Sequence, residues 1–353
     1  MKLLETLTQT PSVAGREHRL REVLIKHTKG LFDETRTDAM GSLICRRKPR
    51  SRGRTSRSSR RPLRVMIAAH MDQIGFMVRH VESNGFLRLQ NVGGFDVRNL
   101  FARLVTVCTD PRSPTGDLPG VMGPSGRPIH IATEQDKKKI PEIHDLVVDL
   151  GLPASKVQKL VSIGDMVVIR APFTQVGDTV VAQCLDNRVA CWLAIRALQK
   201  VRTHACEIYV VFTVQEEVGC RGAGPAAQAI QPDVAIALDT TLCVDTPGVA
   251  EADRVTKQGD GAGLMVMDTS AIADLKLLES FEKLATQKKI KAQRTILPRG
   301  GNDASTIQRK AEGFRVMTLV CPTRYIHTVT EMIHLDDLHA TRDLLAAYLA
   351  QAK

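Results

Sequence analysis

The feature that most restricts the fold is a series of short apolar segments that alternate with amphipathic ones. Residues 63–72 (LRVMIAAHMD) and 207–217 (EIYVVFTVQEE) are continuous apolar runs that end in ionisable residues. Such runs are typical of strands that are buried on both faces of a sheet. Later amphipathic stretches predict helices at about 274–288, 303–310 and 335–351. The sequence therefore predicts an α/β fold with a central mixed sheet flanked by helices.

A region of different composition interrupts this pattern. Residues 76–180 are rich in Gly, Pro and short β-like runs such as GFLRLQ and ARLVTVCT. We interpret this region as a small inserted β-barrel-like domain. The expected domains are a first catalytic part (1–75), the inserted β domain (76–180) and a second catalytic part (181–353).

The positive charge of the chain is local. The net charge is +11, but residues 46–64 hold ten Lys or Arg and no acid, which leaves 39 basic against 38 acidic residues elsewhere. The Ser/Arg-rich composition predicts a solvated loop rather than a core element. A polyanion such as RNA is a possible ligand of this loop, although it lacks aromatic residues for base stacking and nucleic acid is not the expected partner.

Composition also excludes two classes of protein. No apolar run approaches the roughly 18 residues of a membrane span, and the N-terminus lacks a signal-peptide core, so we expect a cytoplasmic protein with no membrane contact. The eight cysteines include no C-x-x-C pair, which argues against a disulfide framework or a cysteine zinc site.

Ionisable residues follow the ends of five predicted strands. In open α/β sheets, ligands bind outside the carboxyl ends of the strands, so these side chains are expected to converge. Each has an ordinary alternative explanation; Asp186, for example, lies where a helix N-cap is expected. Asp268 also ends an apolar run, GLMVMD, so the strand pattern does not exclude it from the converging set. The converging set is His70, Asp72, Asp186, Glu216, Glu217, Asp239 and His327.

Two imidazoles and several carboxylates suit zinc, manganese or cobalt. One ion does not need so many ligands, whereas two ions with a bridging carboxylate do. Asp72 lies two residues after His70 on the same side of a strand, where it can orient the imidazole. Glu216 and Glu217 point to opposite sides, so one is expected to bind metal and the other to act as a general base.

Six motifs together resemble one family. They are AAHMDQIGFMV, CLDNRVAC, TVQEEVGCRGA, ALDTT, GGNDAS and RYIHTVTEM, in this order. The chain is similar over nearly its whole length to the tetrahedral aminopeptidases, dinuclear metallopeptidases of the glutamyl or deblocking type. The resemblance implies hydrolysis of the N-terminal residue of short peptides by a zinc-peptidase-like catalytic domain. It also implies assembly through the β domain into a homo-oligomer, a dodecamer in the family.

The resemblance assigns roles by motif. It implies that His70 and Asp239 bind one ion, that Glu217 and His327 bind the other, and that Asp186 bridges them. It makes Glu216 the base and places Asp72 behind His70, and it leaves Asp268 out of the metal site. The ions are expected to be zinc, with cobalt or manganese as alternatives. The candidate substrate-binding residues are Gly301, Asn302, Arg324 and Tyr325, of which the last two are equally well explained by packing.

The chain departs from the family pattern in places. Gln73 stands where the first motif usually has glutamate, and Asn302 stands where threonine is usual. Two other functions remain open. One is hydrolysis of another bond, since relatives carry endoglucanase labels and paired carboxylates also serve glycosidases. The other is polyanion binding through residues 46–64.

Overall fold

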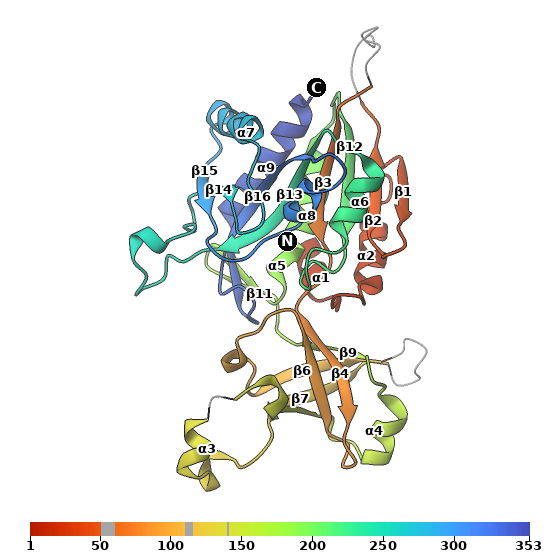
Figure 1. The fold of residues 1–353 in the computed structure, drawn as a ribbon, viewed down its shortest axis with the longest axis vertical. Helices are drawn as coiled ribbons and strands as arrows, with labels where there is room; N and C mark the ends of the chain where they lie inside the picture. Colours follow the sequence, from red (N-terminus) through yellow and green to blue (C-terminus); the bar gives the residue numbers. More distant parts are fainter. Residues whose placement is uncertain (51–60, 110–115, 140) are drawn as a thin grey trace.

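The computed structural model describes residues 1–50, 61–109, 116–139 and 141–353. The chain forms an eleven-stranded mixed sheet with helices on both faces, and a closed barrel of six strands that lies beyond one edge of that layered body (Figure 1). The expected α/β fold with an inserted barrel is confirmed. Most of residues 46–64 lies outside the described residues, so the structure does not bear on the interpretation of the basic segment.

The large sheet is parallel at its centre, where β3 pairs with β12 on one side and β13 on the other. The outer strands add antiparallel pairs. In spatial order the strands are β1 (Glu34–Thr37), β2 (Leu43–Arg47), β12 (Glu207–Thr213), β3 (Arg64–His70), β13 (Val234–Leu242), β16 (Arg315–Arg324), β17 (Glu331–His334), β11 (Thr179–Ala182) and β10 (Thr174–Val176), and β14 (Ala262–Met267) pairs with β16 and with β15 (Ala292–Ile296).

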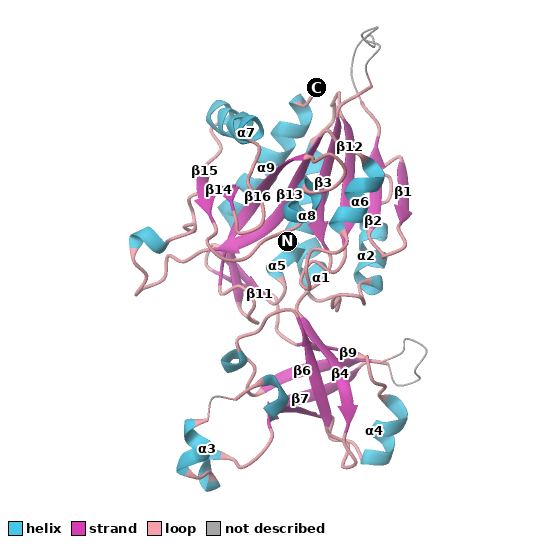
Figure 2. Cartoon of the chain, in the orientation of Figure 1, coloured by secondary structure: helices cyan, strands magenta, loops and turns pink. Residues whose placement is uncertain are grey.

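The central strands are apolar throughout because both faces of the sheet are covered. In β3, Val65, Ile67 and Ala69 pack into one core, and Met66 and Ala68 pack into another. Alternate residues of a strand point to opposite faces, so a strand between two helical layers needs apolar side chains at every position. Figure 2 shows the helices on the two sides of the sheet.

The helices divide between these faces. Helices α1, α2, α5, α7 and α9 pack on the larger core, and α6 and α8 pack on the smaller one. Helices α3 and α4 belong to the barrel region. The bounds are α1 (Lys2–Thr8), α2 (His18–Thr28), α3 (Glu134–Lys138), α4 (Ala154–Leu160), α5 (Leu185–Lys200), α6 (Ala223–Ile230), α7 (Leu275–Lys288), α8 (Ala304–Gln308) and α9 (Leu335–Gln351), with short 3₁₀ turns at Val97–Asn99, Ile129–Ile131, Ile143–Asp145 and Glu251–Asp253.

The barrel has its own apolar core. Phe76 stacks on Phe95 with ring centroids 4.6 Å apart, and Val78 and Val105 are fully buried beside them. A closed barrel leaves no unpaired sheet edge, which suits a small independent layer. Its strands, in order around the barrel, are β4 (Gly75–Val81), β5 (Leu87–Val92), β8 (Leu146–Asp149), β7 (Leu118–Pro124), β6 (Arg103–Cys108) and β9 (Met166–Ile169).

The chain enters the barrel next to the sheet edge where the ionisable residues gather. Residues 71–74 connect β3 to β4, and residues 170–173 lead from β9 back to β10 in the large sheet. Gln73 lies within the first connection, where its backbone N–H donates to the Ser12 carbonyl. Its side-chain oxygen accepts a hydrogen bond from Arg188, 2.9 Å away. Across the described ranges, no helix has the length and apolar character that a bilayer crossing requires.

Candidate metal centre and active site

Seven residues singled out in the sequence come together at one edge of the sheet. They lie at or near the carboxyl ends of strands of the sheet, the end at which ligands bind in open α/β sheets. His70 ends β3, Asp72 follows it, Asp186 lies near the start of α5, Glu216 and Glu217 follow β12, Asp239 lies in β13, and His327 follows β16.

The first ligand-like group contains His70, Asp186 and Asp239. His70 Nε2 lies 3.3 Å from Asp186 Oδ1 and 3.9 Å from Asp239 Oδ1. One potential ligand atom from each residue falls within 4.8 Å of the other two. His70 is 2% exposed, so its imidazole cannot exchange these neighbours for water.

The second group contains Asp186, Glu217 and His327. His327 Nε2 lies 3.4 Å from Glu217 Oε2 and 3.7 Å from Asp186 Oδ2. Asp186 therefore belongs to both groups, and its two carboxylate oxygens face different histidines. The Asp186–Asn187 peptide bond is cis, and Asn187 donates a side-chain hydrogen bond to the Leu238 carbonyl beside the site.

The electrostatics of these groups fit a divalent cation. Among the described residues, Asp186 Oδ1 and Glu217 Oε1 are buried without a hydrogen-bond partner. Burial and the charge of Asp186 raise the pKa values of Glu217 and Asp239 well above their usual range. Buried carboxylates with free oxygens lack a compensating positive charge, and imidazole with carboxylate is a suitable donor set for zinc, manganese or cobalt.

Glu216 is beside the two groups but belongs to neither. Its Oε2 atom lies 3.8 Å from His70 Nε2, and its Oε1 atom accepts a hydrogen bond from the Cys220 thiol at 3.1 Å. Burial raises the pKa of Glu216 to about 8. A carboxylate whose pKa is near neutrality can both accept and return a proton.

Asp72 supports both glutamates from behind. Asp72 Oδ1 accepts the backbone N–H of Glu216, and Oδ2 accepts that of Glu217, each at 3.0 Å. Asp72 Oδ1 also lies 3.5 Å from His70 Nδ1. The fully buried Asp72 carboxylate thus holds the imidazole and the two-glutamate turn in one arrangement.

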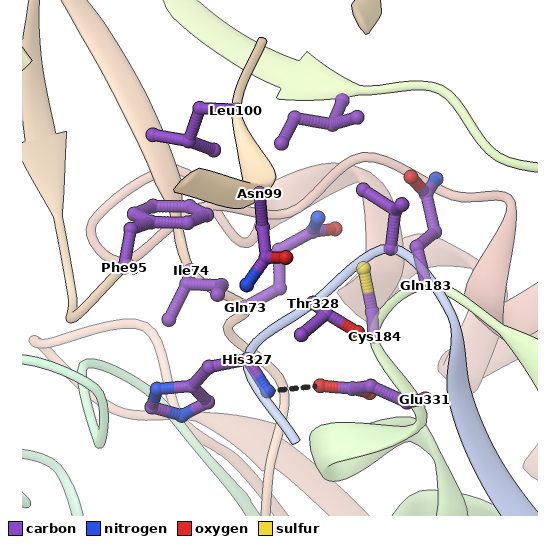
Figure 3. Close-up of a pocket in the computed structure, with 12 residues that line it drawn as sticks. Gln73, Ile74, Phe95, Asn99, Leu100, Gln183, Cys184, His327, Thr328 and Glu331 are labelled. Carbon is purple, nitrogen blue, oxygen red and sulfur yellow. Dashed lines mark hydrogen bonds between the residues drawn. The ribbon is translucent and has the colours of Figure 1, made fainter. Parts of the chain in front are cut away.

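Glu331 is a supporting residue that the sequence interpretation did not single out. Its Oε1 accepts the His327 backbone N–H at 2.8 Å, and its Oε2 accepts the Asp186 backbone N–H at 2.9 Å. Figure 3 shows the first of these bonds beside a pocket that Phe95, Leu100 and Gln183 also line. The buried Glu331 carboxylate therefore links the loop that carries His327 to the start of α5.

The remaining candidates occupy different surroundings. Gly301 lines the cavity in front of the site. Asn302 is buried, where it donates to Asp268 Oδ2 at 2.7 Å and accepts from Thr318. Arg324 pairs with Asp245, and Tyr325 is 49% exposed.

Asp268 lies outside both ligand-like groups. Its Oδ1 accepts from the backbone of Ser270 and Ala271, and its Oδ2 accepts from Asn302, so both oxygens have donors from the protein. Asp303, a further residue that sequence reasoning did not single out, lies next to Glu216 and Cys220.

Comparison with known proteins places this geometry in a family. A model of the M42 glutamyl aminopeptidases matches residues 53–344. The chain belongs to the M42 family. A putative aminopeptidase of Acetivibrio thermocellus is 32% identical over 344 residues, which span 97% of this chain and 96% of the relative.

Solved structures of similar proteins agree with the M42 assignment. Aminopeptidase APDkam598 from Desulfurococcus kamchatkensis superposes with a TM-score of 0.90 at 33% identity, covering 99% of this chain and 94% of that one. The TET1 peptidase of Pyrococcus horikoshii gives a TM-score of 0.85 at 30% identity, covering 99% and 98%. The expectation of a metallo-aminopeptidase of the tetrahedral type is confirmed, and this M42 member is a hydrolase of a family that uses divalent metal.

Proposed function

We propose that this M42 member removes the N-terminal residue of short peptides at a centre for two divalent ions. The observation that carries the proposal is the shared position of Asp186 between two three-residue groups, with Glu216 standing free beside them. His70 and Asp239 would hold one ion, Glu217 and His327 the other, and Asp186 both. Zinc is the proposed metal, with cobalt and manganese as alternatives.

When bound, such ions polarise a carbonyl and lower the pKa of water. Glu216 is the proposed general base. Its Oε2 atom faces the ligand groups. There it takes a proton from the water that attacks the peptide carbonyl, and it later returns that proton to the leaving amine. Asp72 holds Glu216 and His70 in position during this proton transfer, because its Oδ1 contacts both the Glu216 N–H and the His70 ring.

The cavity in front of the site supports recognition of a peptide end. It combines the carboxylates of the site with backbone and small side chains from Thr240, Thr241 and Gly301. A carboxylate of this edge can hold a free α-ammonium group, whereas a blocked N-terminus carries no charge for it to hold. This charge preference supports an exopeptidase rather than an endopeptidase.

The barrel, in the inserted domain proposed for residues 76–180 between catalytic parts 1–75 and 181–353, is proposed to mediate assembly of identical chains. Ile129, Ile131 and Ile163 are each at least 66% exposed in the barrel region, and such apolar side chains are available to pack against another chain. The Pyrococcus horikoshii TET1 peptidase can assemble into a tetrahedron or a large octahedral shell. We propose a dodecamer here that admits short peptides.

The test combines metal content with cleavage of a panel of aminoacyl-anilides, with and without a chelator. About two ions per chain and chelator-sensitive release are expected. An N-acetylated anilide is the matched control, since its amine carries no charge. Equal cleavage of free and acetylated substrates, or release that survives removal of metal, would overturn the proposal.

A further inference from the structure

The loop at residues 297–301 forms one side of the cavity in front of the site. Leu297, Arg299, Gly300 and Gly301 all line that cavity. Among the described residues that line it, Arg299 is the only Lys or Arg, and it is exposed. The cavity therefore combines a single guanidinium with the carboxylates of the two ligand-like groups.

Arg299 is not neutralised by the protein. Within the described part of the chain, its side chain makes no hydrogen bond or ion pair. By contrast, Arg324 at the end of β16 is paired with Asp245 at 2.6 Å. An unpaired guanidinium in a cavity is available to a ligand, and its planar set of N–H donors matches the two oxygens of a carboxylate.

The backbone on both sides of Arg299 is held in place. The Leu297 N–H donates to the Met267 carbonyl at 3.0 Å, and the Gly300 carbonyl accepts the Thr269 N–H at 3.2 Å. The loop is thereby fastened to the segment that follows β14. A charged group on a fastened backbone loses less conformational freedom when it binds a partner, so this loop is suited to recognition.

The loop lies on the Glu216 side of the site. Asp303 follows Arg299 by four residues, and one of its carboxylate oxygens lies within 4.8 Å of a Glu216 oxygen. Thr306 of α8 also donates to the Cys220 carbonyl at 3.1 Å, which joins the start of α8 to the turn after Glu216. Since Glu216 is the group proposed to serve the leaving amine, the departing part of the peptide lies on the side of Arg299.

We propose that Arg299 binds a carboxylate on the part of the peptide that leaves. That carboxylate has two sources, the C-terminus of a di- or tripeptide and an acidic side chain directly after the first residue. The first source would make very short peptides with a free C-terminus the preferred substrates. This inference rests on the proposed function, because the position of Glu216 defines which side of the scissile bond Arg299 serves.

The test compares charged and neutral forms of one peptide. Each peptide begins with the residue cleaved best in the anilide panel, continues with one, two or three glycines, and is made as the free acid and as the C-terminal amide. A second pair of amides carries Asp or Asn after the first residue. The charged member of a pair should have a kcat/KM about 10-fold higher than its neutral partner. This ratio should fall as salt is added, because Arg299 is exposed.

Arg299→Gln should bring the ratio of charged to neutral substrate close to one. Arg299→Lys should retain part of it, since the charge stays but the planar fork is lost. Arg202→Gln, at an exposed arginine between α5 and β12, is the matched control and should keep the wild-type ratio. The ratio within one variant is the readout, because a general loss of structure or metal lowers both members of a pair alike.

Equilibrium binding of the same pairs to Glu216→Gln protein separates this inference from the proposed function. Tighter binding of the charged member, lost when Arg299→Gln is added, in a protein whose wild type cleaves no peptide would refute the proposed function and leave the carboxylate site standing. Equal binding and equal cleavage of charged and neutral members would overturn the carboxylate site. An effect of Arg299→Gln confined to substrates with an acidic first residue would also overturn it, because the carboxylate would then lie across the scissile bond.

Discussion

The carboxylate of Asp72 and the backbone of Glu216 meet at 3.0 Å, and the second Asp72 oxygen makes the same contact with the next residue, Glu217. This relationship explains how two adjacent glutamates are kept at the end of a buried strand. Their side chains diverge, one into a ligand group and one beside it, while their backbone donors converge on one buried acceptor.

Asp72→Asn should weaken the centre without removing a ligand. The amide nitrogen of asparagine cannot accept a hydrogen bond, so the N–H of either Glu216 or Glu217 loses its partner. Metal affinity and kcat are each expected to fall by about 10- to 100-fold. Chelator competition and steady-state kinetics measure the two quantities. Glu251→Gln, on an exposed 3₁₀ turn, is the control, and equal values for both variants would count against the positioning role.

Glu216→Gln should separate binding from turnover. Glutamine preserves the shape of the side chain but cannot carry the proton, so kcat should fall by about 10²- to 10⁴-fold while the metal content stays at two ions per chain. Metal analysis and kinetics on the same preparation provide the comparison. A variant with near-native turnover would show that another group is the base.

Glu331→Gln should weaken the metal centre, because Glu331 holds the backbone of Asp186, proposed for both ions, and of His327, proposed for one. One of the two backbone donors that Glu331 accepts, from Asp186 or His327, then faces an amide N–H₂. We expect about 10-fold weaker metal binding and a loss of about 1–3 kcal/mol in the free energy of unfolding. Glu134→Gln, at a 79% exposed side chain, is the matched control. Unchanged metal affinity together with unchanged stability would contradict this supporting role of Glu331.

Asp245 gives a pH-dependent test away from the ligands. The hydrogen bond from Arg324 holds the pKa of Asp245 at about 2, below its ordinary value of 3.8. Because the folded pKa is depressed, the ion pair contributes stability above about pH 4, and that contribution is lost as pH falls through 2. Asp245→Asn should therefore lower the free energy of unfolding at pH 7 by about 1–2 kcal/mol, which will also lower the urea midpoint.

The same variant should converge on the wild-type midpoint as the pH approaches 2. Unfolding curves at pH 7, 4 and 3 measure the trend. A difference that stays constant down to pH 2.5 would mean that Asp245 contributes through packing rather than through its charge.

The sequence predicted elements with strong local signals. Helix α7 was expected at about 274–288 and runs from Leu275 to Lys288, because the Asp274 side chain caps its first turn by accepting the Leu277 N–H. Helix α9 was expected at 335–351 and has those bounds. Continuous apolar runs likewise located the central strands, since burial on both faces leaves a pattern that is visible without the partners.

Supporting contacts were not predictable in the same way. Glu331 holds Asp186 from 145 residues away, and Thr213 contacts Asp303 across 90 residues. Nothing local to Glu331 or Asp303 distinguishes them from other acids, because their role depends on which segments the fold brings together. For Asp268, too, the structure is needed to show that one carboxylate oxygen accepts from the adjacent turn and the other from the distant Asn302.

Gln73 anchors the chain to the large-sheet domain just before the barrel begins. Ser12 and Arg188 fasten this residue midway along the four-residue connection from His70 to the barrel. The barrel meets the site at a second point, because Val329, two residues after His327, packs into the barrel core. Gln73 fixes the connection on the His70 side, whereas the His327 side is packed directly against the barrel, so contacts that neighbouring chains make with the barrel would act on the second ligand-like group.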